Sequence, residues 1–197
     1  MNQWAAILGF ALVTAFTPGP NNMMLMISSA NFGVRRTLPH CLGITVGFPL
    51  MVAIVGLGLG GLITASPMLH HALTYGAFAF LLYLAWKLAG AGRVDAEGVR
   101  VGRPMGFLAA ALFQWINPKA WIMALGVTAL YVAPGDGAFA SVGRNTVFFV
   151  IAGAGSSLAW CLFGTAIARS LSTDRRVAIF NVAMAVLLVL SMVPTLF

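Results

Sequence analysis

Two short stretches of this chain place polar side chains beside prolines inside long apolar runs. They are TPGPNN at residues 17–22 and NPK at residues 117–119. Proline lacks a backbone donor and collides with the carbonyl four residues earlier, so each stretch should break a helix. A broken helix exposes amide groups at one new end and carbonyls at the other. These groups suit the carboxylate and the ammonium of a zwitterion.

The candidate substrate-binding residues are the two motifs, a glutamine one turn before the second motif, and two serines in a later glycine-rich run. For Gln114, ordinary hydrogen bonding between helices is an equal alternative, and for the serines so is a bond to their own i−4 carbonyl. The prolines could also be simple packing kinks. By residue, the candidates are Thr17, Pro18, Gly19, Pro20, Asn21, Asn22, Gln114, Asn117, Pro118, Lys119, Ser156 and Ser157.

Lys119 is the one formal charge that we place within the hydrocarbon core of the membrane. An intramembrane cation costs at least about 2.5–3.5 kcal/mol on insertion scales, so its side chain should have a partner or a function. We expect it either to pair with a substrate carboxylate or to exchange protons with an ion gradient. The alternatives are that it caps carbonyls of the broken helix or extends toward the cytoplasm.

The composition places these motifs in a membrane. The chain has 197 residues, of which 60% are hydrophobic and 8% charged, and its mean hydropathy is +0.96. A bilayer core of about 30 Å needs roughly 20 apolar residues in a helix. Runs of that size predict a single all-α membrane domain, residues 1–197, with six transmembrane helices at about 4–30, 38–63, 70–90, 107–132, 145–168 and 177–197.

The basic residues predict the orientation. Nine of the eleven fall in or directly beside the loops after the first, third and fifth runs, and the opposite side carries only Arg144. By the positive-inside rule, those three loops are cytoplasmic and both termini lie outside. The net charge of +7 is therefore a topology signal with an attraction to anionic membrane lipids, and it does not indicate a nucleic-acid partner.

The two interruptions lie at matching depth. Pro20 is ten residues from the end of the first run, and Pro118 is eleven from the start of the fourth. At about 1.5 Å per residue, both sit roughly 15 Å from the cytoplasmic side. Two groups of three spans, about residues 1–92 and 103–197, must run in opposite directions. Broken helices 1 and 4 in two inverted three-helix repeats are typical of secondary transporters, with the site between the repeats.

These motifs also carry a family resemblance. TPGPNN in the first run and NPKAW in the fourth, in a chain of this length with six spans, resemble the LysE family of amino-acid exporters, and within it the RhtB-like branch. The resemblance implies a bacterial inner-membrane exporter of amino acids or related metabolites, driven by an ion gradient, most simply of protons. It also leaves a homodimer open, and it supports the involvement of residues 18–22 and 117–119.

The acidic residues favour neutral substrates. All four lie in predicted loops, and some members of the wider family carry an aspartate in the region that reads GITVGFPLM here, residues 43–51. Without that carboxylate, lysine and arginine are weaker candidates than threonine, homoserine or apolar amino acids. Export of another small metabolite, a channel and a non-transporting membrane scaffold remain alternatives.

The sequence suggests no catalytic, cofactor or metal site. Cys41 and Cys161 lie on different spans without metal-ligand or redox spacing, so we interpret them as small packing residues. His40 could relay protons, but an interfacial histidine is the expectation. No paired carboxylates and no Ser/His or Ser/Lys arrangement occur at membrane depth, which argues against an enzyme.

Overall fold

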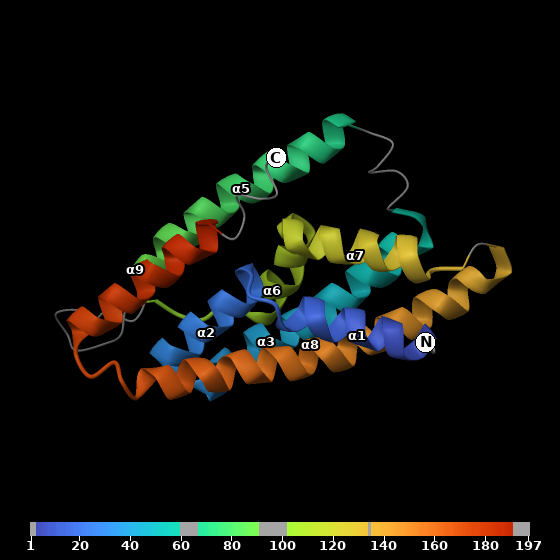
Figure 1. Ribbon diagram of the computed structural model, residues 1–197. Helices are drawn as coiled ribbons and strands as arrows, with labels where there is room; N and C mark the ends of the chain where they lie inside the picture. Colours follow the sequence, from blue (N-terminus) through green and yellow to red (C-terminus); the bar gives the residue numbers. More distant parts are fainter. Residues whose placement is uncertain (1–2, 60–66, 91–101, 134, 191–197) are drawn as a thin grey trace.

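The computed structural model describes residues 3–59, 67–90, 102–133 and 135–190, and these residues are helical with short connections and no strand. Figure 1 shows the helices in chain order. They are α1 (Gln3–Phe16), α2 (Pro20–Phe32), α3 (Val34–Ile54) with the π-helical turn η1 (Val55–Leu59), α5 (Pro67–Ala89), α6 (Phe107–Phe113), the 3₁₀ turn η2 (Gln114–Ile116), α7 (Pro118–Tyr131), the 3₁₀ turn η3 (Gly135–Gly137), α8 (Ala138–Ala168) and α9 (Asp174–Leu190).

Apart from residues 17–19, 90, 117 and 132, helical structure covers the described part of every predicted span. The ends of the second and sixth predicted spans, residues 60–63 and 191–197, lie outside the described residues, as do Arg93 and Arg100 of the longest predicted loop. Two helical stretches, Val34–Leu59 and Gly135–Ala168, are by themselves long and apolar enough to cross a membrane. Their length and composition fit the membrane character that the sequence indicates.

Both predicted helix interruptions are present. The first falls between the end of α1 at Phe16 and the start of α2 at Pro20, and the second lies at Asn117, between η2 and α7. In contrast, α3 continues through Pro49 without interruption. A single proline therefore kinks a helix here at most, whereas the motifs that combine proline with asparagine separate two helices.

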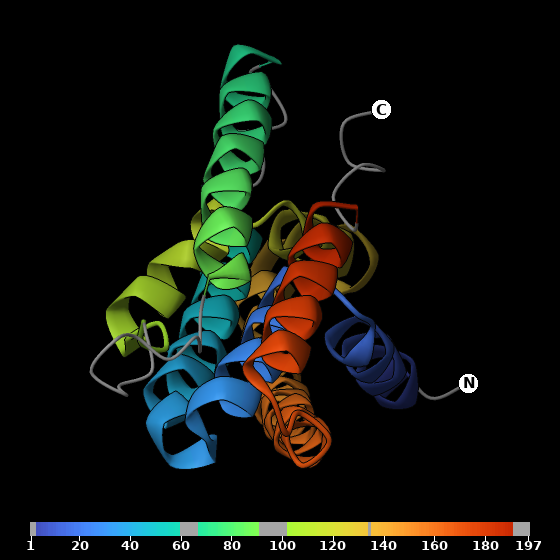
Figure 2. The same ribbon diagram turned by 90° about the vertical axis from the view of Figure 1, so that its left-hand side faces the viewer.

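The longest helix, α8, organises the packing. It runs the length of the bundle and packs against α1, α2 and α3, while α5 and α9 pack against each other (Figures 1 and 2). Glycines allow these close approaches. A methyl group at Gly47 would lie 2.6 Å from the Cα of Ala111 on α6, and one at Gly164 would collide with the Met26 carbonyl on α2. Gly43 and Gly47, four residues apart, both face α6, and small residues at this spacing allow membrane helices to approach closely.

One face of α3 is apolar and exposed on the surface of the protein. Large apolar side chains recur every fourth residue along it and are exposed, at Leu38, Leu42, Val46, Leu50 and Ile54. A stripe of this kind would be unfavourable in water but is suited to lipid. The opposite face of α3 is buried, so this helix separates lipid from the interior.

Candidate functional site

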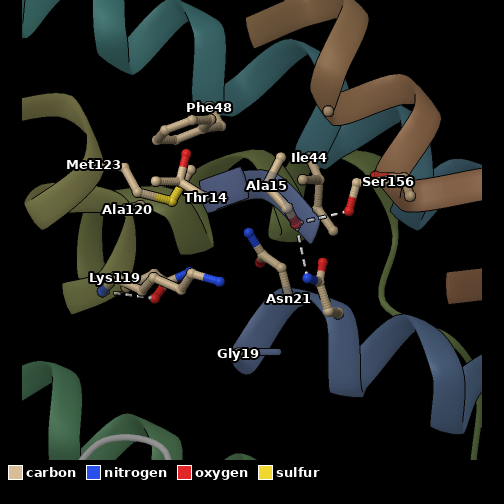
Figure 3. Close-up of a pocket in the computed structure, with 14 residues that line it drawn as sticks. Thr14, Ala15, Gly19, Asn21, Ile44, Phe48, Lys119, Ala120, Met123 and Ser156 are labelled. Carbon is tan, nitrogen blue, oxygen red and sulfur yellow. Dashed lines mark hydrogen bonds between the residues drawn. The ribbon is translucent and has the colours of Figure 1, made fainter. Parts of the chain in front are cut away.

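The two helix interruptions meet at one cavity. Its walls come from α1, α2, α3, α7 and α8, and Figure 3 shows the side chains that line it. The cavity volume is about 40 Å³, which is space for a few water molecules.

The end of α1 supplies carbonyl oxygens to the cavity region. The Ala15 carbonyl accepts hydrogen bonds from Asn22 Nδ2 at 2.9 Å and from Ser156 Oγ at 2.7 Å (Figure 3). The Thr17 carbonyl accepts a second bond from Asn22 Nδ2, also at 2.9 Å. Asn22 thus links the start of α2 to the end of α1, and Ser156 links α8 to the same Ala15 carbonyl. Backbone groups at a break inside a membrane protein need such partners.

Lys119 reaches from the second interruption to the first. Its Nζ donates to the Thr17 carbonyl at 2.5 Å and lies 3.4 Å from the Pro18 carbonyl. Its side chain lies along Gly19, where a methyl group would come within 2.7 Å of the lysine Cδ. Lys119 therefore caps carbonyls, as one of the alternatives predicted. These carbonyls follow the end of α1 and belong to the first broken helix, whereas Lys119 belongs to the second.

A pair of amides forms a second connection between the interruptions. Asn21 Nδ2 donates to Gln114 Oε1 at 2.8 Å, and Gln114 Nε2 donates back to Asn21 Oδ1 at 3.2 Å. Gln114 is fully buried and also donates to the Ala110 carbonyl at 2.8 Å. The predicted interhelical hydrogen bonding of Gln114 is thus present, and its partner is a residue of the first motif.

Helices α2 and α7 both begin with proline as their first residue, Pro20 in α2 and Pro118 in α7. Proline suits this position because the first helical N–H groups have no partner within the helix. Asn117 precedes α7 and accepts a hydrogen bond from the Lys119 N–H at 3.2 Å through its side chain. Two positive helix ends therefore lie beside one cavity.

All twelve predicted site residues gather around these interruptions. Seven line the cavity: Gly19, Asn21, Asn22, Asn117, Lys119, Ser156 and Ser157. The others lie next to it, since Thr17 and Pro18 offer carbonyls to Lys119, Gln114 holds Asn21, and the two prolines begin α2 and α7. For Ser156, the alternative of a bond to its own helix is wrong, because its hydroxyl donates to Ala15 on α1.

Sequence reasoning missed the apolar wall of the cavity. Ile44 and Phe48 line it from α3, and Ala120 and Met123 line it from α7 (Figure 3). Ile44 and Phe48 are one helical turn apart in the stretch where the family resemblance directs attention to an absent aspartate. Their spacing of one helical turn places both side chains on the same face of α3, and that periodicity is the signal that could have identified them.

One other expectation needs correction: His40 is not interfacial, since only 1% of its surface is exposed. The interpretation of Cys41 and Cys161 as packing residues is confirmed, and their sulfur atoms lie 3.1 Å apart. Both cysteines are reduced and buried, and they join α3 to α8 within the core.

Comparison with known proteins agrees with this arrangement. The family described as LysE type translocator matches residues 12–193. A cysteine/O-acetylserine efflux protein of Salmonella paratyphi A is 31% identical over 188 residues, covering 94% of this chain and 93% of the relative. The protein of the same name from Escherichia coli K12 matches with the same identity and coverage. No solved structure matches the chain. The chain belongs to the LysE type translocator family and is a membrane transport protein, not an enzyme.

Proposed function

We propose that the protein is a secondary active exporter of small neutral amino acids or closely related metabolites across the bacterial inner membrane. The observation that carries this proposal is the meeting of two broken helices at one cavity, with carbonyls from one break and two helix N-termini around it. Secondary transporters bind zwitterionic substrates at such places. The family membership and the efflux function named for the relatives agree with it.

The packing supports an architecture of two inverted repeats, residues 1–92 and 103–197. Each span would contact its counterpart in the other repeat. The first and fourth meet through Lys119 and through the Asn21–Gln114 pair, the second and fifth through α3 and α8, and the third and sixth through α5 and α9. Such pairing is expected when two similar halves are related by an axis in the membrane plane.

The substrate would bind in two parts. Its carboxylate would occupy the N-terminal ends of α2 and α7, where backbone N–H groups and the side chain of Asn21 can donate. Its ammonium would take the place that Lys119 Nζ now occupies, against the Thr17 and Pro18 carbonyls. Lys119, once displaced, would pair with the carboxylate. Substrate and lysine would thus exchange partners as the site opens.

The transport step would break the contacts between the repeats. Lys119 to Thr17 and Asn21 to Gln114 both cross from one proposed half to the other, and the cavity between them has a volume of only about 40 Å³. Rocking of one half against the other would enlarge the cavity and separate these pairs. Because Lys119 is an ionisable group at this position, we propose the proton as the coupling ion. One chain contains the whole proposed site, so a homodimer is not required.

The apolar wall favours a small neutral substrate. None of the described residues that line the cavity is acidic, and Ile44, Phe48 and Met123 face the space where a substrate side chain would lie. A cationic side chain would have no partner there, which agrees with the expectation against lysine and arginine. The relatives are named for efflux of cysteine and O-acetylserine, and substrates of this size suit the site.

Counterflow in proteoliposomes tests the proposal. Purified protein is loaded with unlabelled amino acid, and uptake of labelled cysteine, O-acetylserine, threonine, leucine and lysine is compared. We expect saturable exchange of the small neutral members, loss of exchange in Lys119→Ala, and little change in the control Arg169→Ala, whose cation lies at the end of α8. Folded protein without exchange of any compound would favour a scaffold, and flux without saturation would favour a channel.

The proposed orientation has its own test. Both termini are proposed to lie outside, as the distribution of basic residues indicates. A cysteine tag at either terminus should react with a membrane-impermeant maleimide in intact cells. Protection of both tags until the cells are opened would reverse the orientation.

A further inference from the structure

A second and larger cavity lies away from the helix interruptions. Its volume is about 250 Å³, and it is enclosed by α2, α3, α5 and the segment that leads into α6. It shares no lining residue with the central cavity. Lys87 and Arg103 line it, and both flank the longest loop, which the charge distribution places on the cytoplasmic side. The cavity therefore lies toward the cytoplasmic ends of these helices.

His40 gives this cavity an unsatisfied polar group. The side chain lines the cavity, is 1% exposed, and neither ring nitrogen has a hydrogen-bond partner among the described residues. Buried polar groups in proteins are almost always hydrogen-bonded, to protein, to water or to a ligand. An imidazole in this position can donate a hydrogen bond to a bound oxygen. His40 thus gives the cavity lining a polar group whose hydrogen-bonding capacity is not used by the described residues.

The remaining lining residues define the chemical class of that ligand. Lys87 and Arg103 are cations, and no acidic side chain is among the described lining residues. Ser28 and Tyr83 add hydroxyl groups, while most other members, such as Phe80 and Leu84, are apolar. Two cations and a histidine in the lining of a mostly apolar cavity suit an anionic group that is attached to an apolar body.

We propose that this cavity binds an amphipathic anion, whose phosphate or carboxylate lies between Lys87, Arg103 and His40 and whose apolar part packs against Phe80 and Leu84. Two sources have this chemistry: the headgroup of an acidic phospholipid and a soluble organic anion of the cytoplasm. The binding site is separate from the proposed transport site, and it does not depend on the identity of the exported substrate.

The test observes His40 directly by nuclear magnetic resonance. The protein is prepared in neutral detergent with ¹³C-labelled histidine and with His70→Gln and His71→Gln, so that His40 gives the one histidine signal. Three probes are titrated: dihexanoyl phosphatidylglycerol, dihexanoyl phosphatidylcholine and hexyl phosphate. The variant Lys87→Gln with Arg103→Gln removes the cations. Arg169→Gln with Arg175→Gln removes the same charge from another cytoplasmic loop and serves as the matched control.

We expect the anionic lipid to shift the His40 signal saturably and the zwitterionic lipid to do so at least about tenfold more weakly. Removal of Lys87 and Arg103 should weaken binding about tenfold or more, whereas the matched control should stay within about twofold. A response to hexyl phosphate as well would identify any amphipathic anion as a ligand, and its absence would identify the lipid headgroup. No saturable shift with either anionic probe, or equal loss in both double variants, would overturn the proposal and leave water as the partner of His40.

Discussion

The reciprocal hydrogen bonds between Asn21 and Gln114 allow a double-mutant cycle at the centre of the molecule. The two bonds, of 2.8 and 3.2 Å, link the start of α2 to the turn before α7. Gln114→Met and Asn21→Leu keep approximate size and remove the polar groups. Each single variant breaks both bonds and leaves the other amide, which is fully buried for Gln114 and half-buried for Asn21, without this partner, which costs about 1–3 kcal/mol of unfolding free energy.

The double variant should lose less than the sum of the two single variants. Side-chain hydrogen bonds between membrane helices contribute about 0.6 kcal/mol on average and up to about 1.7 in such cycles. Two bonds should therefore give a coupling of about 1–2 kcal/mol. Gln114→Met should be the more damaging single change, because it also removes the bond to the Ala110 carbonyl.

The assay is reversible unfolding of the purified protein in mixed micelles, followed by the helical circular dichroism signal. All four proteins are measured under one condition, and the coupling is read from the cycle. Strict additivity, within about 0.3 kcal/mol, would refute the reasoning, because sites that do not touch behave in that way. It would show that the two amides find other partners in the membrane.

Three further predictions concern the same framework. Lys119→Met should abolish counterflow but leave a folded protein. Lys119→Arg should retain part of the counterflow, because the guanidinium can still donate to the carbonyls at the end of α1. Equal activity of Lys119→Met and wild type in proteoliposomes would place the site elsewhere. Mild oxidation should join Cys41 to Cys161 in the otherwise unchanged protein, since their sulfur atoms are 3.1 Å apart, and mass spectrometry should find a loss of two hydrogens that reduction restores. If Cys41 and Cys161 stay free thiols under conditions that fully oxidise the exposed cysteines of a reference protein, the result would argue against the contact of α3 with α8. Gly164→Ala should destabilise the fold by about 1–3 kcal/mol, because the added methyl group meets the backbone of α2. Gly143→Ala on the same helix is the control: its methyl group would enter open space, so the change should be neutral or stabilising by up to about 1 kcal/mol.

The sequence predicted the helical interruptions because their cause is local. A proline removes its own donor and displaces a carbonyl on its own helix, whatever surrounds it. The same holds for the apolar runs, since the length of a span depends on the thickness of the bilayer and not on neighbouring helices. Residues 17–22 and 117–119 could therefore be identified as one candidate site before any coordinates were known.

The partners of the polar side chains could not be predicted in the same way. Lys119 contacts the Thr17 carbonyl, Ser156 contacts Ala15, and His40 lies in a closed interior. Sequence reasoning left the first two open and placed the third at the interface. Each of these contacts depends on how far a helix is rotated about its own axis.

In water, an amphipathic pattern of residues fixes that rotation, because one face of a helix is apolar and the other is polar. A helix surrounded by lipid is apolar on all sides, so α3 and α8 carry little of that signal. Their exposed stripes and glycine contacts appear only once the helices are packed together. The sequence alone thus determined where the helices break and that they lie in a membrane. The tertiary structure decided which donor meets which carbonyl, because close packing between helices sets their rotation.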